Sequence, residues 1–162
     1  MNRFRLVAAT ALFAPLGALA PLGVAAPAQA AVQVPFTITE QINSATNVTT
    51  FTATGPICPS GTFVDDVKIF APNPESSGID SSGTLNLLIR TVYTCADGSG
   101  TFNALKHVFI TFTENGFTNT GPIQLLGGTG SHTGLGGHGV NNGTRTGDTG
   151  VGQISGFVVS GT

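Results

Sequence analysis

"TLNLLIRTVYTCADGSGTFNALKHVFITFTENGFTNTGPIQLL", residues 84–126, predicts three consecutive β-strands. β-Branched and aromatic residues dominate this stretch, and apolar residues do not recur at helical spacing over three turns. Two dipeptides that favour tight hairpin turns, Asp97-Gly98 and Asn115-Gly116, divide it. We therefore expect strands at 84–95, 101–114 and 117–126 to be antiparallel neighbours in one sheet.

The same composition continues on both sides of this stretch and predicts five more strands. The first of them alternates strictly between apolar and polar residues, as a half-buried strand does. A polar segment rich in Pro, Ser and Gly, residues 71–83, is expected to be a long exposed connection. The five further strands are expected at 32–42, 46–54, 62–70, 132–140 and 151–159.

This pattern predicts an all-β fold. The strands at 84–95 and 101–114 carry apolar residues on both faces, so both of their faces need cover. A closed eight-stranded antiparallel β-barrel provides an interior, and loops or a second subunit can cover its outside. Closure also removes exposed strand edges. A two-layer β-sandwich of the same strands is the alternative.

Residues 1–30 have the features of a secretory signal peptide. Arg3 and Arg5 precede an uncharged apolar run that ends in a small-x-small cleavage pattern at Ala28-Gln29-Ala30. A retained membrane helix is the alternative, but prolines interrupt the run. We expect a secreted, extracellular product of one domain, residues 31–162, with no membrane association after cleavage.

The mature segment carries four basic and eight acidic residues, a formal charge of −4. It has no basic cluster that could neutralise phosphates, so nucleic acid is not an expected partner. Its two cysteines, Cys58 and Cys95, are expected to form a structural disulfide in an oxidising compartment. Their wide spacing lacks the C-x-x-C geometry of reactive thiols.

The glycine-rich stretch "GGTGSHTGLGGHG", residues 127–139, contains G-x-G-x-x-G at Gly134, Gly136 and Gly139. A dinucleotide site requires a helix that begins at these glycines. The residues that follow, "VNNGTRTGDTG", favour no helix, so a nucleotide site is not expected. The glycines instead indicate a sharp bend of the backbone at a barrel rim.

The longer stretch "LLGGTGSHTGLGGHG", residues 125–139, resembles the glycine signature between late strands of the allene oxide cyclase barrel, which dirigent proteins share. His132 stands where that family usually has an aromatic residue. The resemblance implies an eight-stranded barrel whose lumen holds a hydrophobic molecule, an isomerase or cyclase activity, and homo-oligomers. The family's catalytic residues lie outside the matched segment. The matching positions are Gly127, Gly128, Thr129, Gly130, Gly134 and Gly137.

Three residues are candidates for a ligand pocket. Glu40 shares a face with Phe36 and Ile38 and either turns inward or reaches solvent at the strand end, the position we favour. Arg90 is either an exposed charge at a strand edge, which is the position we favour, or a cation fixed in a pocket. Tyr93, the only tyrosine, is expected in the core, with a phenol that contacts ligand in the lumen as the alternative.

Asp65, like Glu40, either turns its carboxylate inward or reaches solvent, although Asp65-Asp66 also fits a β-bulge. The three histidines, His107, His132 and His138, lack the spacing that would direct them at one zinc ion. No metal or cofactor is expected. A Gly-x-Ser-x-Gly nucleophile motif is absent from the sequence.

Two functions remain from the sequence. One is a secreted barrel that binds a small hydrophobic ligand or promotes its cyclisation by shape. The other is a structural or surface-interaction β module with a filled interior. A lumen that Glu40, Arg90 or Tyr93 enters would favour the first, and a lumen filled by Phe and Leu side chains would favour the second.

Overall fold

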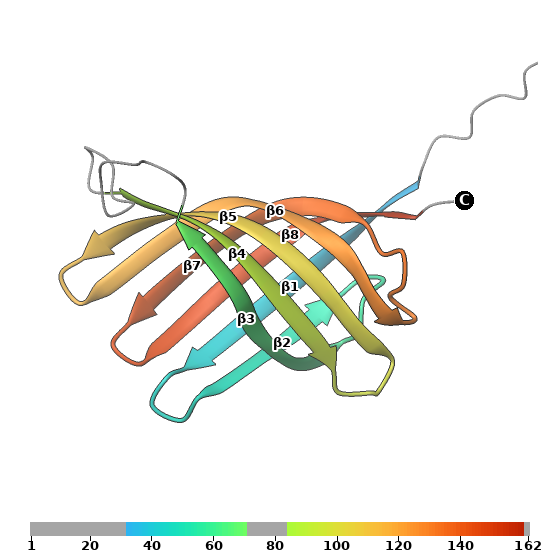
Figure 1. Cartoon of the computed structure of the whole chain (residues 1–162), viewed down its shortest axis with the longest axis horizontal. Coiled ribbons are helices and arrows are strands. Elements are labelled where there is room, and N and C mark those ends of the chain that lie inside the picture. Colours follow the sequence, from blue (N-terminus) through green and yellow to red (C-terminus); the bar gives the residue numbers. More distant parts are fainter. Residues whose placement is uncertain (1–31, 71–83, 161–162) are drawn as a thin grey trace, which may run out of the picture.

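A computed structural model describes residues 32–70 and 84–160. These residues form a closed barrel of eight antiparallel strands in sequence order (Figure 1). β1 pairs with β8 over twelve residues, from Val32↔Ser160 to Asn43↔Thr149, which closes the barrel. The predicted barrel is therefore confirmed and the β-sandwich alternative is wrong. The strands are β1 (Val32–Asn43), β2 (Val48–Thr54), β3 (Ser60–Phe70), β4 (Thr84–Cys95), β5 (Gly100–Thr113), β6 (Gly116–Gly130), β7 (Gly137–Thr146) and β8 (Thr149–Ser160).

Two predicted segments lie outside the described residues: the signal peptide at 1–30 and the connection at 71–83. Among the residues that are described, there is no helix with the length and apolar character needed to traverse a bilayer.

The glycine run differs from its expected structure. Residues 127–130 extend β6 beyond Leu126, and Gly130 pairs with Gly100 of β5. A Cβ atom on Gly128 would lie 2.1 Å from the Thr101 carbonyl oxygen, so only glycine permits this approach. The chain then reverses in residues 131–136, with His132 N–H donating to the Thr129 carbonyl.

The seventh strand consequently begins five residues later than predicted, at Gly137, and continues to Thr146. The Asn-rich segment 141–145 joins the sheet because Asn141 turns inward, is buried, and donates to Asn119 Oδ1 of β6 at 2.7 Å. The predicted seventh strand ended at residue 140, and this buried amide pair helps to hold the additional residues in the sheet.

Alternate residues of each strand line the interior, as a closed barrel requires. On β5 these are the residues with even numbers, and Phe102 and Ala104 are fully buried. Phe112 shares this face but is 54% exposed, because it lies one residue from the end of the strand.

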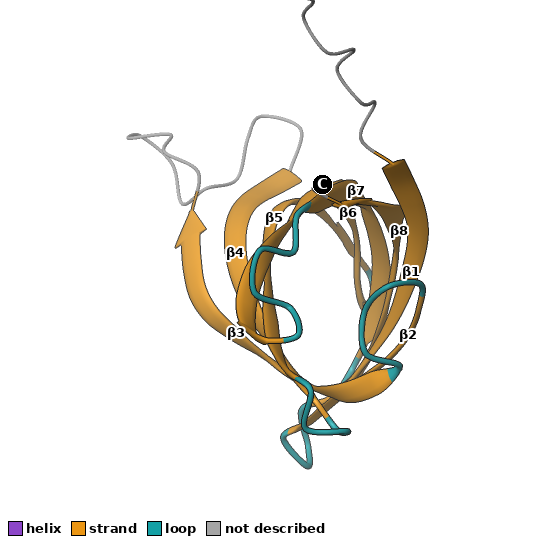
Figure 2. Cartoon of the chain, turned by 90° about the vertical axis from the view of Figure 1, so that its right-hand side faces the viewer, coloured by secondary structure: helices purple, strands orange, loops and turns teal. Residues whose placement is uncertain are grey.

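The two ends of the barrel differ. Figure 2 looks at the end that carries the connections 55–59, 96–99 and 131–136, here called the closed end. Inside the barrel, next to the closed end, lies an aromatic plug in which each side chain is no more than 2% exposed. Among the described residues, the turns at 44–47, 114–115 and 147–148 mark the opposite end, here called the open end. The plug consists of Phe36, Phe51, Phe63, Tyr93 and Phe102.

Cys58 and Cys95 form the predicted disulfide, with Cα atoms 5.9 Å apart. Cys58 lies in the β2–β3 connection and Cys95 ends β4, so the bond ties the closed end together. His132 from the β6–β7 connection is buried beside it, and its ring lies 5.6 Å from that of Phe102.

Candidate functional site

Three polar side chains meet inside the barrel where the aromatic plug ends. Glu40 of β1 accepts hydrogen bonds at Oε1 from the Tyr93 hydroxyl of β4 and from the Lys106 ammonium of β5. All three are buried, with 4%, 0% and 5% of each residue exposed. We call Glu40, Tyr93 and Lys106 the interior triad. Its members come from three strands, so only the closed sheet brings them together.

Glu40 points inward because β1 does not end there. The strand continues for three residues, and Glu40 pairs with Phe51 of β2 on one side and with Gly152 of β8 on the other. Gly152 leaves the space that the carboxylate fills: a Cβ atom at this position would lie 2.7 Å from Glu40 Oε2. Because Gly152 of β8 has no side chain, the Glu40 carboxylate of β1 fits beside it.

Aromatic rings enclose the other two members. The Tyr93 ring stacks on Phe102 with centroids 4.5 Å apart and planes 9° apart. The Lys106 Nζ atom lies 5.6 Å from the ring centroids of both Phe63 and Tyr93. An ammonium over aromatic faces gains cation–π attraction, which adds to the ion pair with Glu40.

Burial, followed by the charge of Glu40 and the hydrogen bond to it, raises the pKa of Tyr93 well above its ordinary value of 10.0. A phenolate here would lose hydration and face a carboxylate. Tyr93 is therefore a hydrogen-bond donor to Glu40 throughout the physiological pH range.

A cavity of about 280 Å³ extends from the triad toward the open end. Apolar side chains supply most of its wall, with a few polar groups among them. Asp65 lies on this wall and accepts a 2.9 Å hydrogen bond from Thr91. At the mouth, Arg145 donates to Ser44 Oγ at 2.7 Å. The apolar wall is formed by Ile42, Phe63, Leu87, Ile89, Val108, Ile110, Phe117 and Val151.

The structure separates the three predicted pocket residues. Glu40 lies in the interior, so the favoured solvent-exposed position is wrong, because continued pairing of β1 holds its carboxylate inside. Tyr93 is in the core with its hydroxyl bonded. Arg90 lies on the outer face, half exposed and 3.6 Å from Asp66, so the favoured exposed position holds, although β4 is paired on both sides and has no free edge. Asp65 is next to a bulge, since the β3–β4 register shifts between Asp65 and Val67.

Sequence reasoning missed Lys106. The signal was available, because Lys106 stands at an even position of β5 between Ala104 and Val108, in an alternation whose neighbours are all apolar. A charged residue in the middle of such an alternation points into the core. Its partner Glu40 lies 66 residues away, and only the closed barrel identifies it.

The histidines lie apart. His132 is buried at the closed end, whereas His107 is half-buried and packs on Phe109, and His138 is exposed. Among the described residues, His132 lies close to potential metal ligands: its ring nitrogen and the sulfurs of Cys58 and Cys95 are within 4.8 Å of one another. The disulfide joins those two sulfurs, so neither is a thiolate ligand.

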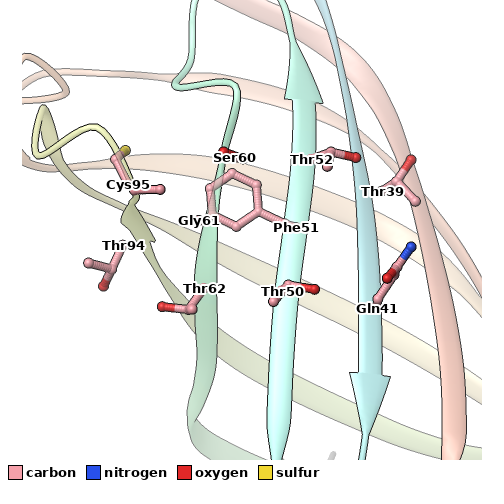
Figure 3. A pocket seen from close by; sticks show the side chains of 11 residues that line it. Thr39, Gln41, Thr50, Phe51, Thr52, Ser60, Gly61, Thr62, Thr94 and Cys95 are labelled. Atoms are coloured by element: carbon pink, nitrogen blue, oxygen red, sulfur yellow. The ribbon is translucent and has the colours of Figure 1, made fainter.

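A larger hollow of about 490 Å³ lies on the outside of the barrel, over β1 to β4 (Figure 3). Hydroxyl and amide side chains such as Thr39, Gln41 and Thr52 surround it, and no residue lining it carries a charge. The interior cavity is smaller, but Glu40 and Lys106 line it and Tyr93 donates to Glu40. We therefore take the interior cavity as the candidate site.

The sequence matches no protein-family model, and neither the curated proteins nor the solved structures contain a match to it. The likeness to allene oxide cyclase and dirigent proteins rests on the glycine signature and on the eight-stranded barrel alone.

Proposed function

We propose that this protein is an exported barrel that binds a small, largely apolar molecule in the cavity at its open end. One observation carries the proposal: the buried Glu40–Lys106 ion pair, to which Tyr93 is hydrogen-bonded, forms the floor of a cavity whose wall is mostly apolar. Burying an ion pair is often no more stabilising than apolar packing of equal volume, so stability alone does not account for it. Apolar walls with a few fixed polar groups are typical of small-molecule sites.

The size of the cavity limits the ligand. About 280 Å³ is near the lower end of the range for small-molecule pockets, roughly 300–1,000 Å³. The aromatic plug fills the remaining interior. A compact ligand with one polar group would place that group at the triad and its apolar part toward Val108 and Ile110.

Turnover by shape, as the family resemblance implies, is an extension of the same proposal. A rigid apolar cavity favours a folded conformer of a flexible substrate, and Glu40 is placed to accept a proton from a group bound at the floor. The competing function is a structural β module, which the aromatic plug favours.

The binding test uses the single tyrosine. The sequence has no tryptophan and one tyrosine, so intrinsic fluorescence reports on Tyr93 and hence on the cavity floor. We expect compact neutral alcohols such as hexanol to change this emission saturably. Native mass spectrometry of the exported protein would show whether a molecule co-purifies with it.

A matched pair of variants locates the binding. Val108→Phe fills the cavity from its wall, whereas Val64→Phe makes the same change on the outer face, where Val64 is 64% exposed. Binding should be lost in the first variant and kept in the second. Unchanged binding in Val108→Phe, or no binding by the unaltered protein, would favour the structural module.

A further inference from the structure

Lys106 is a primary amine on the wall of the candidate cavity. Its side chain is 6% exposed, and it donates to Glu40 while facing the Phe63 and Tyr93 rings. An ammonium has three N–H donors, of which Glu40 accepts one. The other two can serve a ligand that enters from the open end.

The charged side chains at the floor of the cavity determine which polar group a ligand can place there. Glu40 already neutralises Lys106, and Asp65 adds a second carboxyl group to the cavity wall. At the floor an anionic head group would therefore meet two carboxylates beside one ammonium in a poorly hydrated site, where like charges repel strongly. The other cation of the cavity, Arg145, lies at the mouth and donates to Ser44. A neutral acceptor, such as a carbonyl oxygen, meets no such repulsion.

A neutral carbonyl next to a lysine has a defined chemistry. Buried lysines act as Schiff-base nucleophiles when a neighbouring group can take their proton. The Glu40 carboxylate is in direct hydrogen-bond contact with Lys106 Nζ and can take it. We infer, as an extension of the proposed function, that the ligand is an aldehyde or ketone and that Lys106 condenses with it to form an imine.

The steps balance without a further reactant. Lys106 gives one proton to Glu40, and the freed Nζ electron pair attacks the carbonyl carbon while the C=O π pair moves to oxygen. A proton then moves from nitrogen to that oxygen, which gives a neutral carbinolamine. Glu40 returns its proton to the hydroxyl group, water leaves, and a protonated imine remains. The cationic imine faces the Glu40 carboxylate, so the ion pair of the free protein is kept in the product.

The sequence makes the test selective, because Lys68 and Lys106 are its only lysines. The protein is incubated with hexanal or benzaldehyde and sodium cyanoborohydride, which reduces an imine to a stable secondary amine. Cleavage after arginine then separates the lysines: Lys106 lies in the segment 91–145, between Arg90 and Arg145, and Lys68 lies upstream. Mass spectrometry of the segments locates the adduct.

We expect the adduct in segment 91–145 of the unaltered protein and of Lys68→Arg. It should disappear in Lys106→Arg, which keeps the positive charge for Glu40 but has no primary amine. Val108→Phe keeps Lys106 but fills the cavity, so labelling should fall, whereas Val64→Phe should label normally. Circular dichroism confirms that each variant is folded.

The outcomes separate the two proposals. Saturable binding of hexanol with no adduct in segment 91–145 would overturn the imine while leaving the binding function intact. Labelling of Lys106 that Val108→Phe does not reduce would also overturn it, because the reaction would then not use the cavity. Failure of both the alcohol and the aldehydes to engage the protein would overturn the proposed function itself.

Discussion

Glu40 is the residue that joins the interior triad, because both the phenol and the ammonium donate to its Oε1 atom. Neutralising it leaves a buried ammonium without a counter-charge. We expect Glu40→Gln to lower the free energy of unfolding by about 3 kcal/mol, the usual result of breaking one side of a buried ion pair. Urea denaturation followed by circular dichroism measures this change.

Glu114 offers the matched control for that substitution, since it is exposed in the turn after β5. Glu114→Gln should alter stability by no more than about 0.5 kcal/mol, as surface substitutions usually do. Equal effects of the two variants would show that the buried ion pair does not contribute to stability.

The environment of Tyr93 predicts how the stability of the fold changes at high pH. Burial and the neighbouring carboxylate raise its pKa in the folded state, so the folded protein holds this proton more tightly than the unfolded chain. Its contribution to stability is complete below the unfolded value of about 10 and is lost as the pH rises through the folded value. Phenolate absorbance should therefore appear together with unfolding above pH 10. Phenolate formation in a still-folded barrel would contradict this prediction.

The interior residues differ in how far the sequence could predict them. Strict alternation placed Glu40 on the face of Phe36 and Ile38, but it could not say whether a carboxylate two residues from the predicted strand end reached solvent. The alternation of β5 contained a signal for an inward Lys106, which the sequence prediction missed. That these two form a pair depends on barrel closure across 66 residues, which no local pattern contains.

At the scale of the strand, Gly152 of β8 helps to position the triad because it has no side chain. A methyl group at Gly152 would contact the Glu40 carboxylate, which two hydrogen bonds hold in place. Gly152→Ala should therefore cost about 1–3 kcal/mol of stability, as overpacking in a core does, and should weaken hexanol binding. Urea denaturation and Tyr93 fluorescence measure the two effects.

Gly136 is the control for that substitution. A Cβ atom there would have no atom within 4 Å, and the residue is not in the left-handed region. Gly136→Ala should leave binding unchanged and stability nearly so. If Gly152→Ala behaved in the same way, the space beside Glu40 would not be needed for the carboxylate's position.

Strand existence was more predictable than strand ends. Hairpin signals at Asp97-Gly98 and Asn115-Gly116 fixed β4, β5 and the start of β6, because turn chemistry is local. The β6–β7 boundary was misplaced because glycines are typical both of turns and of closely approaching strands. The contact that decides between them, Gly128 against Thr101 of β5, comes from a different strand.

At the scale of the whole molecule, the barrel divides into two ends with different interiors. The disulfide and the aromatic plug lie toward the closed end, and the cavity lies toward the open end, with the triad and Phe63 at the boundary between them. Apolar residues on both faces of the strands at 84–95 and 101–114 favoured the closed barrel over open layers. The division could not be predicted, because it depends on which interior layers carry large aromatic rings and which carry Leu, Ile, Val and glycine.

This division predicts that stability and binding can be changed separately. The Cys58–Cys95 bond closes a loop with a sequence separation of 37 residues, so chain entropy gives a loss of about 4 kcal/mol when both cysteines become serine. Thermal unfolding measures the loss, and reductant should lower the midpoint of the unaltered protein but not of the double variant. Below its midpoint, the double variant should still bind hexanol with normal Tyr93 fluorescence changes, because the cavity opens at the other end. Loss of binding in the folded double variant would show instead that the closed end controls the shape of the cavity.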